Sequence, residues 1–212
     1  MNITTNPTFI FISTKLYLCS IYFLTNYMKN KNPYVLKTPL IIYNTFQVLL
    51  NIYIIQGLIG LSQITFNDNL KYFTYIHYLS KYLDYCDTCF IILRKKDNQL
   101  TFFHIYHHYL IGIIWGMSLH NGVGNGTGSF GCLLNSIIHF LMYTHYLWTS
   151  FGYNNPFKKL ITRFDILFLH SIVVLFYQNI YPKHYEWIQL GYQLQMFTLF
   201  TNFYKKIYQS SK

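Results

Sequence analysis

Charged residues are scarce in this chain, and acidic residues are the scarcest. Of 212 residues, 10% are charged and only 6 are Asp or Glu, whereas a soluble domain carries roughly 25% charged residues. In contrast, 52% of the residues are hydrophobic and 21% are aromatic. The composition therefore excludes an ordinary soluble domain and indicates a protein whose solvent is lipid.

Cysteine is also rare, and the four cysteines do not form a recognisable framework. Cys19, Cys86, Cys89 and Cys132 all lie inside apolar runs, which argues against a set of disulfides. Cys86 and Cys89 form a C-x-x-C pair, but a structural zinc site needs a second pair that the chain lacks. We therefore expect neither a disulfide scaffold nor a metal site here.

Long apolar runs are what the sequence has in abundance. A membrane helix needs about 20 mostly apolar residues. The candidate runs are Phe9–Tyr27, Pro39–Leu61, Tyr72–Ile92, Phe103–Leu119, Ser129–Thr149, Leu160–Asn179 and Trp187–Tyr208. The sequence thus predicts an all-α, multi-pass membrane protein with about seven transmembrane helices, forming a single integral membrane domain over residues 1–212.

The net charge of +10 does not indicate a nucleic-acid partner, because the basic residues form short clusters between apolar runs. With seven spans, twelve of the 16 basic residues fall on one side. These are Lys29, Lys31, Lys37, Arg94, Lys95, Lys96, Lys158, Lys159, Arg163, Lys205, Lys206 and Lys212. The positive-inside rule then predicts a cytosolic C-terminus and a lumenal N-terminus. The glycosylation sequons at Asn2 and Asn125 would face the lumen.

Charged residues inside the third predicted span form the first polar cluster. Lys81, Asp84 and Thr88 recur at helical spacing on one face, and the i, i+3 spacing lets Lys81 pair with Asp84. Asp87 is left over and is expected to find a partner on another helix. Intramembrane charges mark functional sites by default, although a purely structural ion pair is the alternative.

Three histidines in the fourth predicted span form the second cluster. His104, His107 and His108 have i, i+3, i+4 spacing and project from one helix face. Each neutral imidazole needs both a donor and an acceptor. Three roles for these histidines are therefore open. They could be metal ligands, acid–base or nucleophilic groups, or core residues whose hydrogen bonds are satisfied by their neighbours.

The fifth predicted span carries a third polar patch. Asn135, His139, Tyr143 and Tyr146 share one face with Met142, and Met142 is expected only to pack. This patch could meet the histidines across a helix bundle.

These residues, in this order, resemble the ELO family of very-long-chain fatty acid elongases, which are 3-ketoacyl-CoA synthases. The family pattern KxxExxDT matches Lys81, Asp84, Asp87 and Thr88, with Asp in place of Glu at 84. HxxHH matches His104, His107 and His108, and HxxMYxYY matches His139, Met142, Tyr143 and Tyr146, with His145 in place of a Tyr. The family's TxxQxxQ would begin at Thr162, where Asp165 and Phe168 replace the glutamines.

The resemblance implies a fold and a reaction. Six of seven helices would enclose a narrow acyl tunnel that opens to the cytosol. A long-chain acyl-CoA would condense with malonyl-CoA to give a 3-ketoacyl-CoA, with release of CO2 and CoA. His107 would carry the acyl group, and His104, His108, His139 and Asn135 are candidates for the supporting base or donor. No cofactor is expected beyond the two CoA substrates.

The resemblance also implies substrate-binding residues, partners and a location. Substrate contacts are expected from Lys81, Asp84, Asp87, Thr88, Asn135, Tyr143 and Tyr146. CoA phosphates need cations, and those on the predicted cytosolic side are Arg94, Lys95, Lys96, Lys158, Lys159 and Lys205. The implied location is the endoplasmic reticulum membrane. The implied partners are membrane lipid and the ketoacyl reductase, dehydratase and enoyl reductase of the elongation cycle, and a homodimer is left open.

Two other functions remain as alternatives. Membrane di-iron hydroxylases and desaturases also contain HxxHH boxes, but two irons need about eight histidines in several boxes, and this chain has 9 histidines with one such box. A catalytically degenerate or non-enzymatic seven-helix membrane protein is the second alternative, favoured by the departures at Asp165 and Phe168.

Overall fold

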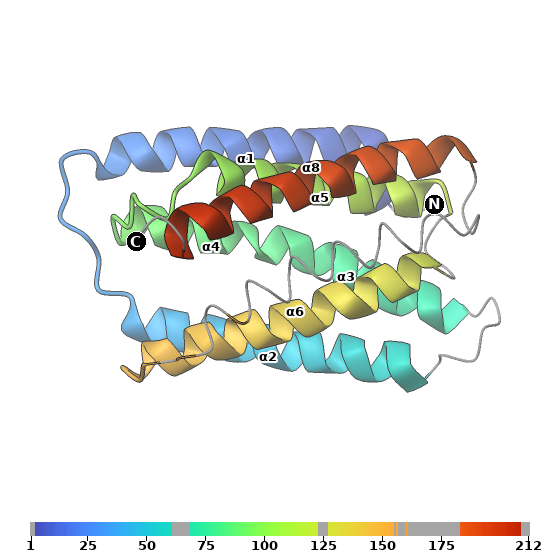
Figure 1. Cartoon of the computed structure of the whole chain (residues 1–212). Helices are drawn as coiled ribbons and strands as arrows, with labels where there is room; N and C mark the ends of the chain where they lie inside the picture. The colour runs from blue at the N-terminus through green and yellow to red at the C-terminus, as the bar shows by residue number, and fades with distance from the viewer. Residues whose placement is uncertain are drawn as a thin grey trace.

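The computed structural model of the chain describes residues 3–60, 68–122, 127–154, 156, 160 and 183–208. All regular structure in this part of the chain is helical, as the sequence predicts (Figure 1). The elements are the 3-10 helix η1 (Ile3–Thr5) and the α-helices α1 (Pro7–Met28), α2 (Lys37–Gly60), α3 (Asp68–Leu83), α4 (Tyr85–Leu93), α5 (Phe102–His120), α6 (Thr127–Ser150) and α8 (Lys183–Tyr208).

The helices follow the predicted apolar runs closely, with one difference. The run predicted as a single span over Tyr72–Ile92 forms two helices, α3 and α4, which meet at Asp84. The predicted span Leu160–Asn179 lies outside the described residues, apart from Leu160. The number of spans therefore stays a prediction.

Local capping fixes where two of the helices begin. The side chain of Asn6 accepts a hydrogen bond from the Thr8 N–H, and Pro7 occupies the first turn of α1, where its missing N–H costs nothing. Thr101 caps α5 in the same way by accepting from the His104 N–H at 3.2 Å. The cap therefore sets His104 in the first turn of α5.

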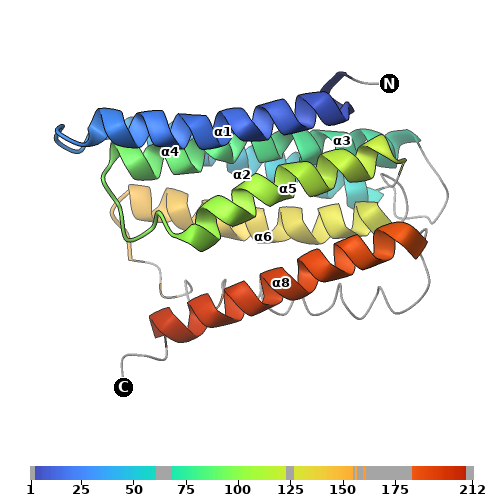
Figure 2. The same cartoon turned by 90° about the horizontal axis from the view of Figure 1, so that it is seen from above.

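The described helices form an antiparallel bundle around the rod made by α3 and α4. One group of contacts joins α2, α3 and α6, and another joins α1, α4 and α5 (Figures 1 and 2). Since α3 also contacts α5 and α8 contacts α5, the rod connects the two groups. α6 and α8 run in the same direction, so α6 ends and α8 begins at opposite ends of the bundle.

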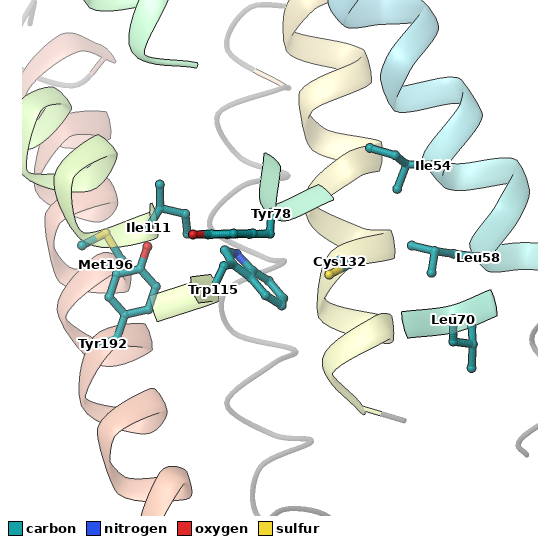
Figure 3. Packing of buried hydrophobic residues seen from close by; sticks show 9 residues of the cluster. All are labelled: Ile54, Leu58, Leu70, Tyr78, Ile111, Trp115, Cys132, Tyr192 and Met196. Carbon is teal, nitrogen blue, oxygen red and sulfur yellow. The ribbon is translucent and has the colours of Figure 1, made fainter. Parts of the chain in front are cut away.

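An apolar cluster fills the interior beside the rod. Figure 3 shows its nine buried residues, which come from α2, α3, α5, α6 and α8: Ile54, Leu58, Leu70, Tyr78, Ile111, Trp115, Cys132, Tyr192 and Met196. Trp115 and Ile111 lie one to three turns after the histidines along α5. The histidines are thus nearer the start of α5 than this apolar cluster is.

The outer faces of α1 and α2 are apolar. Phe11, Ile12, Leu16 and Phe23 on α1 are exposed, and an apolar surface of this kind suits lipid rather than water. Within the described residues, these two helices are long and apolar enough to cross a membrane by length and composition.

Eight of the twelve basic residues in the described segments lie at one end of the bundle. The link from α1 to α2, the link from α4 to α5 and the end of α8 are adjacent at the left of Figure 1. They carry Lys29, Lys31 and Lys37, then Arg94, Lys95 and Lys96, then Lys205 and Lys206. The grouping that the sequence predicts is therefore present for these eight residues.

The close approach of α1 to α5 at Gly116 gives a test of the fold. A Cβ at Gly116 would lie 2.7 Å from Ile10 Cδ1 and 3.1 Å from Tyr78 Cε2, and both of these side chains are fully buried. We expect Gly116→Val to lower the free energy of unfolding by about 1–3 kcal/mol through overpacking. Thermal unfolding of the detergent-purified chain measures this effect.

Gly191→Val on α8 is the matched control, because a Cβ there meets nothing within 4 Å. Equal unfolding midpoints for the two variants would contradict the α1–α5 packing.

Candidate active site

A buried ion pair lies in the last turn of α3. Lys81 Nζ is 3.1 Å from Asp84 Oδ2, and each residue is only 1% exposed. Lys81 Nζ also donates to Asn135 Oδ1 on α6 at 3.0 Å and lies 3.4 Å from His139 Nε2. The predicted i, i+3 pair is therefore present, and it connects the rod to α6.

The helix break at Asp84 follows from the position of this carboxylate. Asp84 stands at the start of α4, yet its side chain makes no capping bond there. It points instead toward Lys81, while the Asp87 N–H reaches the Asp84 carbonyl at 3.1 Å. This i to i+3 bond tightens the chain locally, as in a 3-10 turn, and divides the predicted span in two.

Asp87 has the partner on another helix that the sequence predicts. The hydroxyl of Tyr143 on α6, a fully buried residue, donates to Asp87 Oδ2 at 2.6 Å. The same hydroxyl lies 3.0 Å from Asp84 Oδ1. One phenol proton therefore serves two carboxylates, and the shorter contact favours Asp87.

The three histidines of α5 turn inward, but toward different neighbours. His104 and His108 lie one turn apart, with ring centroids 4.3 Å apart and ring planes tilted by 47°, and they lie on the side of α1 and α4. His107 faces α8, where the Tyr192 hydroxyl lies 3.5 Å from His107 Nδ1. The physical reason is helix geometry, since residues i+3 and i+4 are about 100° apart around the axis.

A chain of hydroxyl groups supports His104. His104 Nε2 lies 2.9 Å from Thr88 Oγ1 on α4, and Thr88 Oγ1 lies 2.9 Å from the Tyr17 hydroxyl on α1. Tyr17 is buried and stacks on the ring of Tyr85, with centroids 4.2 Å apart. Three helices therefore fix the orientation of this one imidazole.

The polar patch of α6 and the histidines of α5 both contact the rod of α3 and α4. His139 is buried and its Nδ1 lies 3.6 Å from Asp84 Oδ2. His104 of α5 meets the same rod at Thr88, with 2.9 Å between His104 Nε2 and Thr88 Oγ1. The structure therefore brings the three sequence motifs together at the junction of α3 and α4.

Some predicted site residues lie at the edge of this cluster. Tyr146 shares its helix face with Tyr143 but is 41% exposed, because it lies near the end of α6; its ring contacts that of Tyr143 edge-on. Arg94, Lys95 and Lys96 follow α4, where Lys95 Nζ donates to the Lys29 carbonyl, and Lys205 lies in the last turn of α8. Lys158 and Lys159 are outside the described residues.

Four residues around this cluster were not predicted from the sequence. They are Tyr17, Gln47, His77 and Tyr192. Gln47 on α2 donates to Asp84 Oδ1 at 2.9 Å, and His77 Nδ1 lies 3.1 Å from Ser136 Oγ. A signal existed for Gln47, since Tyr43, Gln47 and Asn51 repeat every four residues in an apolar helix. Tyr17 and Tyr192 gave none, because the chain holds 22 tyrosines.

The arrangement suits nucleophilic and acid–base chemistry by imidazole. Histidine rings lie within hydrogen-bond reach of hydroxyl groups that orient them, and the buried ammonium of Lys81 supplies positive charge in the neighbouring motif. Within the described ranges, no three His, Cys, Asp or Glu side chains have the arrangement of a metal site.

Removing the ammonium tests the buried pair. Lys81→Met leaves Asp84 buried without its counter-charge, so we expect the free energy of unfolding to fall by about 3–5 kcal/mol. Thermal unfolding in detergent measures this loss, with Lys71→Met as a control at an exposed lysine. The double variant Lys81→Met/Asp84→Asn should be more stable than Lys81→Met alone. If both lysine variants unfolded at the same temperature, the pair would not support the fold.

Comparison with known proteins identifies the family. Residues 2–212 match the ELO: GNS1/SUR4 family. The chain is 43% identical over 203 residues to fatty acid elongase 5 of Leishmania major, covering 90% of this chain and 81% of that protein. It is 39% identical over 202 residues to fatty acid elongase 4 of Trypanosoma brucei brucei, covering 89% and 80%. Against very long chain fatty acid elongase 4 of Homo sapiens, identity is 33% over 230 residues, covering 95% and 71%. The chain therefore belongs to the ELO family of membrane proteins, the family of these fatty acid elongases.

Proposed function

We propose that this protein is a fatty acid elongase that condenses a long-chain acyl-CoA with malonyl-CoA to form a 3-ketoacyl-CoA. One observation carries the proposal: in a member of the ELO family, the rod of α3 and α4 contacts His104 of α5 through Thr88 and His139 of α6 through Lys81 and Asp84. An acyltransferase needs a nucleophile and a group that stabilises negative charge, and these two groups of residues supply both.

His107 is the proposed nucleophile. If its Nδ1–H donates to the Tyr192 hydroxyl, the lone pair of Nε2 is left to attack the thioester carbon. The bond from carbon to sulfur breaks, the Nδ1 proton passes to the CoA thiolate, and an acyl-imidazole remains. His104 and His108 are the bases in reach that relay this proton.

The second half-reaction uses malonyl-CoA. Loss of CO2 leaves an enolate whose electron pair attacks the acyl carbon, and His107 departs and takes up a proton. Positive charge and hydrogen-bond donors stabilise an enolate, and the groups we assign to this task are Lys81, Asn135 and His139. Asp84, Asp87, Thr88, Tyr143 and Tyr146 are assigned to substrate positioning around them.

The acyl chain is proposed to lie in a tunnel within a seven-span bundle, with six helices around it. Burying the chain contributes roughly 0.8 kcal/mol per methylene. Because α6 ends and α8 begins at opposite ends of the bundle, seven spans require one further crossing. The apolar run 160–179 is the sequence's candidate for that crossing. Residues 1–212 would then form one membrane domain.

The basic end of the bundle is proposed as the entrance for CoA. Arg94, Lys95, Lys96, Lys158, Lys159 and Lys205 are the candidate phosphate ligands. The positive-inside rule places this end in the cytosol, with the N-terminus in the lumen of the endoplasmic reticulum. No cofactor is assigned. The proposed partners are membrane lipid and the ketoacyl reductase, dehydratase and enoyl reductase that act on the product; a homodimer is not assigned.

Trapping the acyl-enzyme tests the nucleophile. Incubation of the purified chain with a long-chain acyl-CoA and no malonyl-CoA should add the mass of one acyl group, mapped to His107 by fragmentation. His107→Ala should show no added mass and no 3-ketoacyl product, because no other group replaces the lost nitrogen. His120→Ala, at the far end of α5, should behave like the unchanged protein. Full turnover by His107→Ala would refute the assignment.

Charge reversal tests the CoA entrance. Arg94→Glu and Lys205→Glu should each raise KM for malonyl-CoA about three- to tenfold, because one phosphate contact becomes repulsive. The kcat should change little, and added salt should narrow the difference from the unchanged protein. Lys71→Glu serves as the control, because Lys71 is in the first turn of α3, and α3 begins at the opposite end of the bundle (Figure 1). If Lys71→Glu raised KM more than Arg94→Glu or Lys205→Glu did, an entrance at the basic end would be contradicted.

A further inference from the structure

Gln47 lies where α2 meets the ion pair, and no sequence motif includes it. Its side chain is fully buried. Gln47 Nε2 lies 2.9 Å from Asp84 Oδ1, 2.9 Å from the Tyr43 hydroxyl and 3.3 Å from the Tyr143 hydroxyl. Because an ionised carboxylate only accepts hydrogen bonds, the amide nitrogen must face it. The two amide protons therefore have their shortest contacts with Asp84 and Tyr43.

The two oxygens of Asp84 have separate partners. Oδ2 faces Lys81 at 3.1 Å and His139 at 3.6 Å, and Oδ1 faces Gln47 and Tyr143. The proton of Tyr143 has its shorter contact with Asp87, so Gln47 is the donor that Oδ1 retains. Gln47 thereby fixes the rotation of the carboxylate, and the carboxylate orients Lys81 and the His139 ring.

The length of residue 84 gives Gln47 a second task. The pattern that the chain resembles has Glu at this position, and Asp is one methylene shorter. Asp84 is 1% exposed and Gln47 is 0% exposed, so the amide occupies the space on the Oδ1 side into which a longer carboxylate would extend. A glutamate at 84 would meet Gln47 unless residue 47 were smaller.

We propose that Gln47 is a positioning residue of the active site: it holds Asp84, and through Asp84 the His139 ring, and it compensates for the missing methylene of residue 84. Residues 47 and 84 then form a matched pair in which a short carboxylate requires a long amide. The catalytic part of this inference rests on the proposed function; the pairing of the two side chains does not.

The test compares Gln47→Met, Gln47→Ala, Asp84→Glu and Gln47→Ala/Asp84→Glu in the full chain. Methionine keeps the volume of Gln47 but donates no hydrogen bond. Gln47→Met should lower kcat about tenfold or more, the effect of losing a hydrogen bond to a buried charge, with KM for malonyl-CoA unchanged. Since His139 is assigned to the second half-reaction, the acyl adduct on His107 should form at the normal rate and accumulate.

Asp84→Glu alone should also lower kcat, and the double variant should exceed both Gln47→Ala and Asp84→Glu. Asn51→Ala is the matched control, because Asn51 is equally buried one turn along α2 but bonds the Gln47 carbonyl rather than Asp84. It should retain the kcat of the unchanged protein even if its unfolding temperature falls.

Three results would overturn the inference: full kcat in Gln47→Met, a double variant whose kcat does not exceed that of both single variants, or equal kcat losses in Gln47→Met and Asn51→Ala. If the unchanged protein gave no acyl adduct and no product, the proposed function would fail instead. The pairing would still be measured by the unfolding temperatures of the same variants. Additive shifts at 47 and 84 would refute it, and non-additive shifts would support it.

Discussion

The buried pair of Lys81 and Asp84 is the constraint on which the rest of the site depends. Two charges away from water are costly unless each is paired and hydrogen-bonded. Asn135, Gln47 and Tyr143 supply these bonds from α2 and α6. A helix that moved or rotated would leave a charge uncompensated, so the pair fixes the relative positions of α2, α3 and α6. Such pairs contribute more to a unique arrangement than to stability, since apolar residues would often pack as well.

The histidines depend on this arrangement indirectly. The cap at Thr101 sets the start of α5, and the packing of α5 against α1, α3 and α8 sets its rotation. His104 and His108 then face α1 and α4, while His107 faces Tyr192 of α8. His107, which is proposed to carry the acyl group, thus faces a different helix from His104 and His108, which are proposed to move protons. Different surroundings suit groups with different roles.

Membership of the ELO family explains why these polar residues persist in an apolar chain. Lipid does not satisfy buried charges, so Lys81, Asp84 and Asp87 form their hydrogen bonds with Asn135, Gln47 and Tyr143 on neighbouring helices. The aspartate at 84 shows how one departure from the family pattern is accommodated. The shorter carboxylate of Asp84 lies against the amide of Gln47. The replacement of Glu by Asp at residue 84 is therefore compensated by a hydrogen bond from α2.

The sequence by itself determined the solvent, the helical class, the extent of most helices and the polar residues of the three motifs. These follow from local hydropathy, capping and 3.6-residue spacing, which also predicted the Lys81–Asp84 pair. Only the tertiary structure decided that Tyr143 partners Asp87, 56 residues away, that Gln47 partners Asp84, and that α3 and α4 separate at Asp84. It also placed His107 apart from its two neighbours. Contacts between distant helices depend on which helices are adjacent and how each is rotated, and a one-dimensional pattern does not specify either.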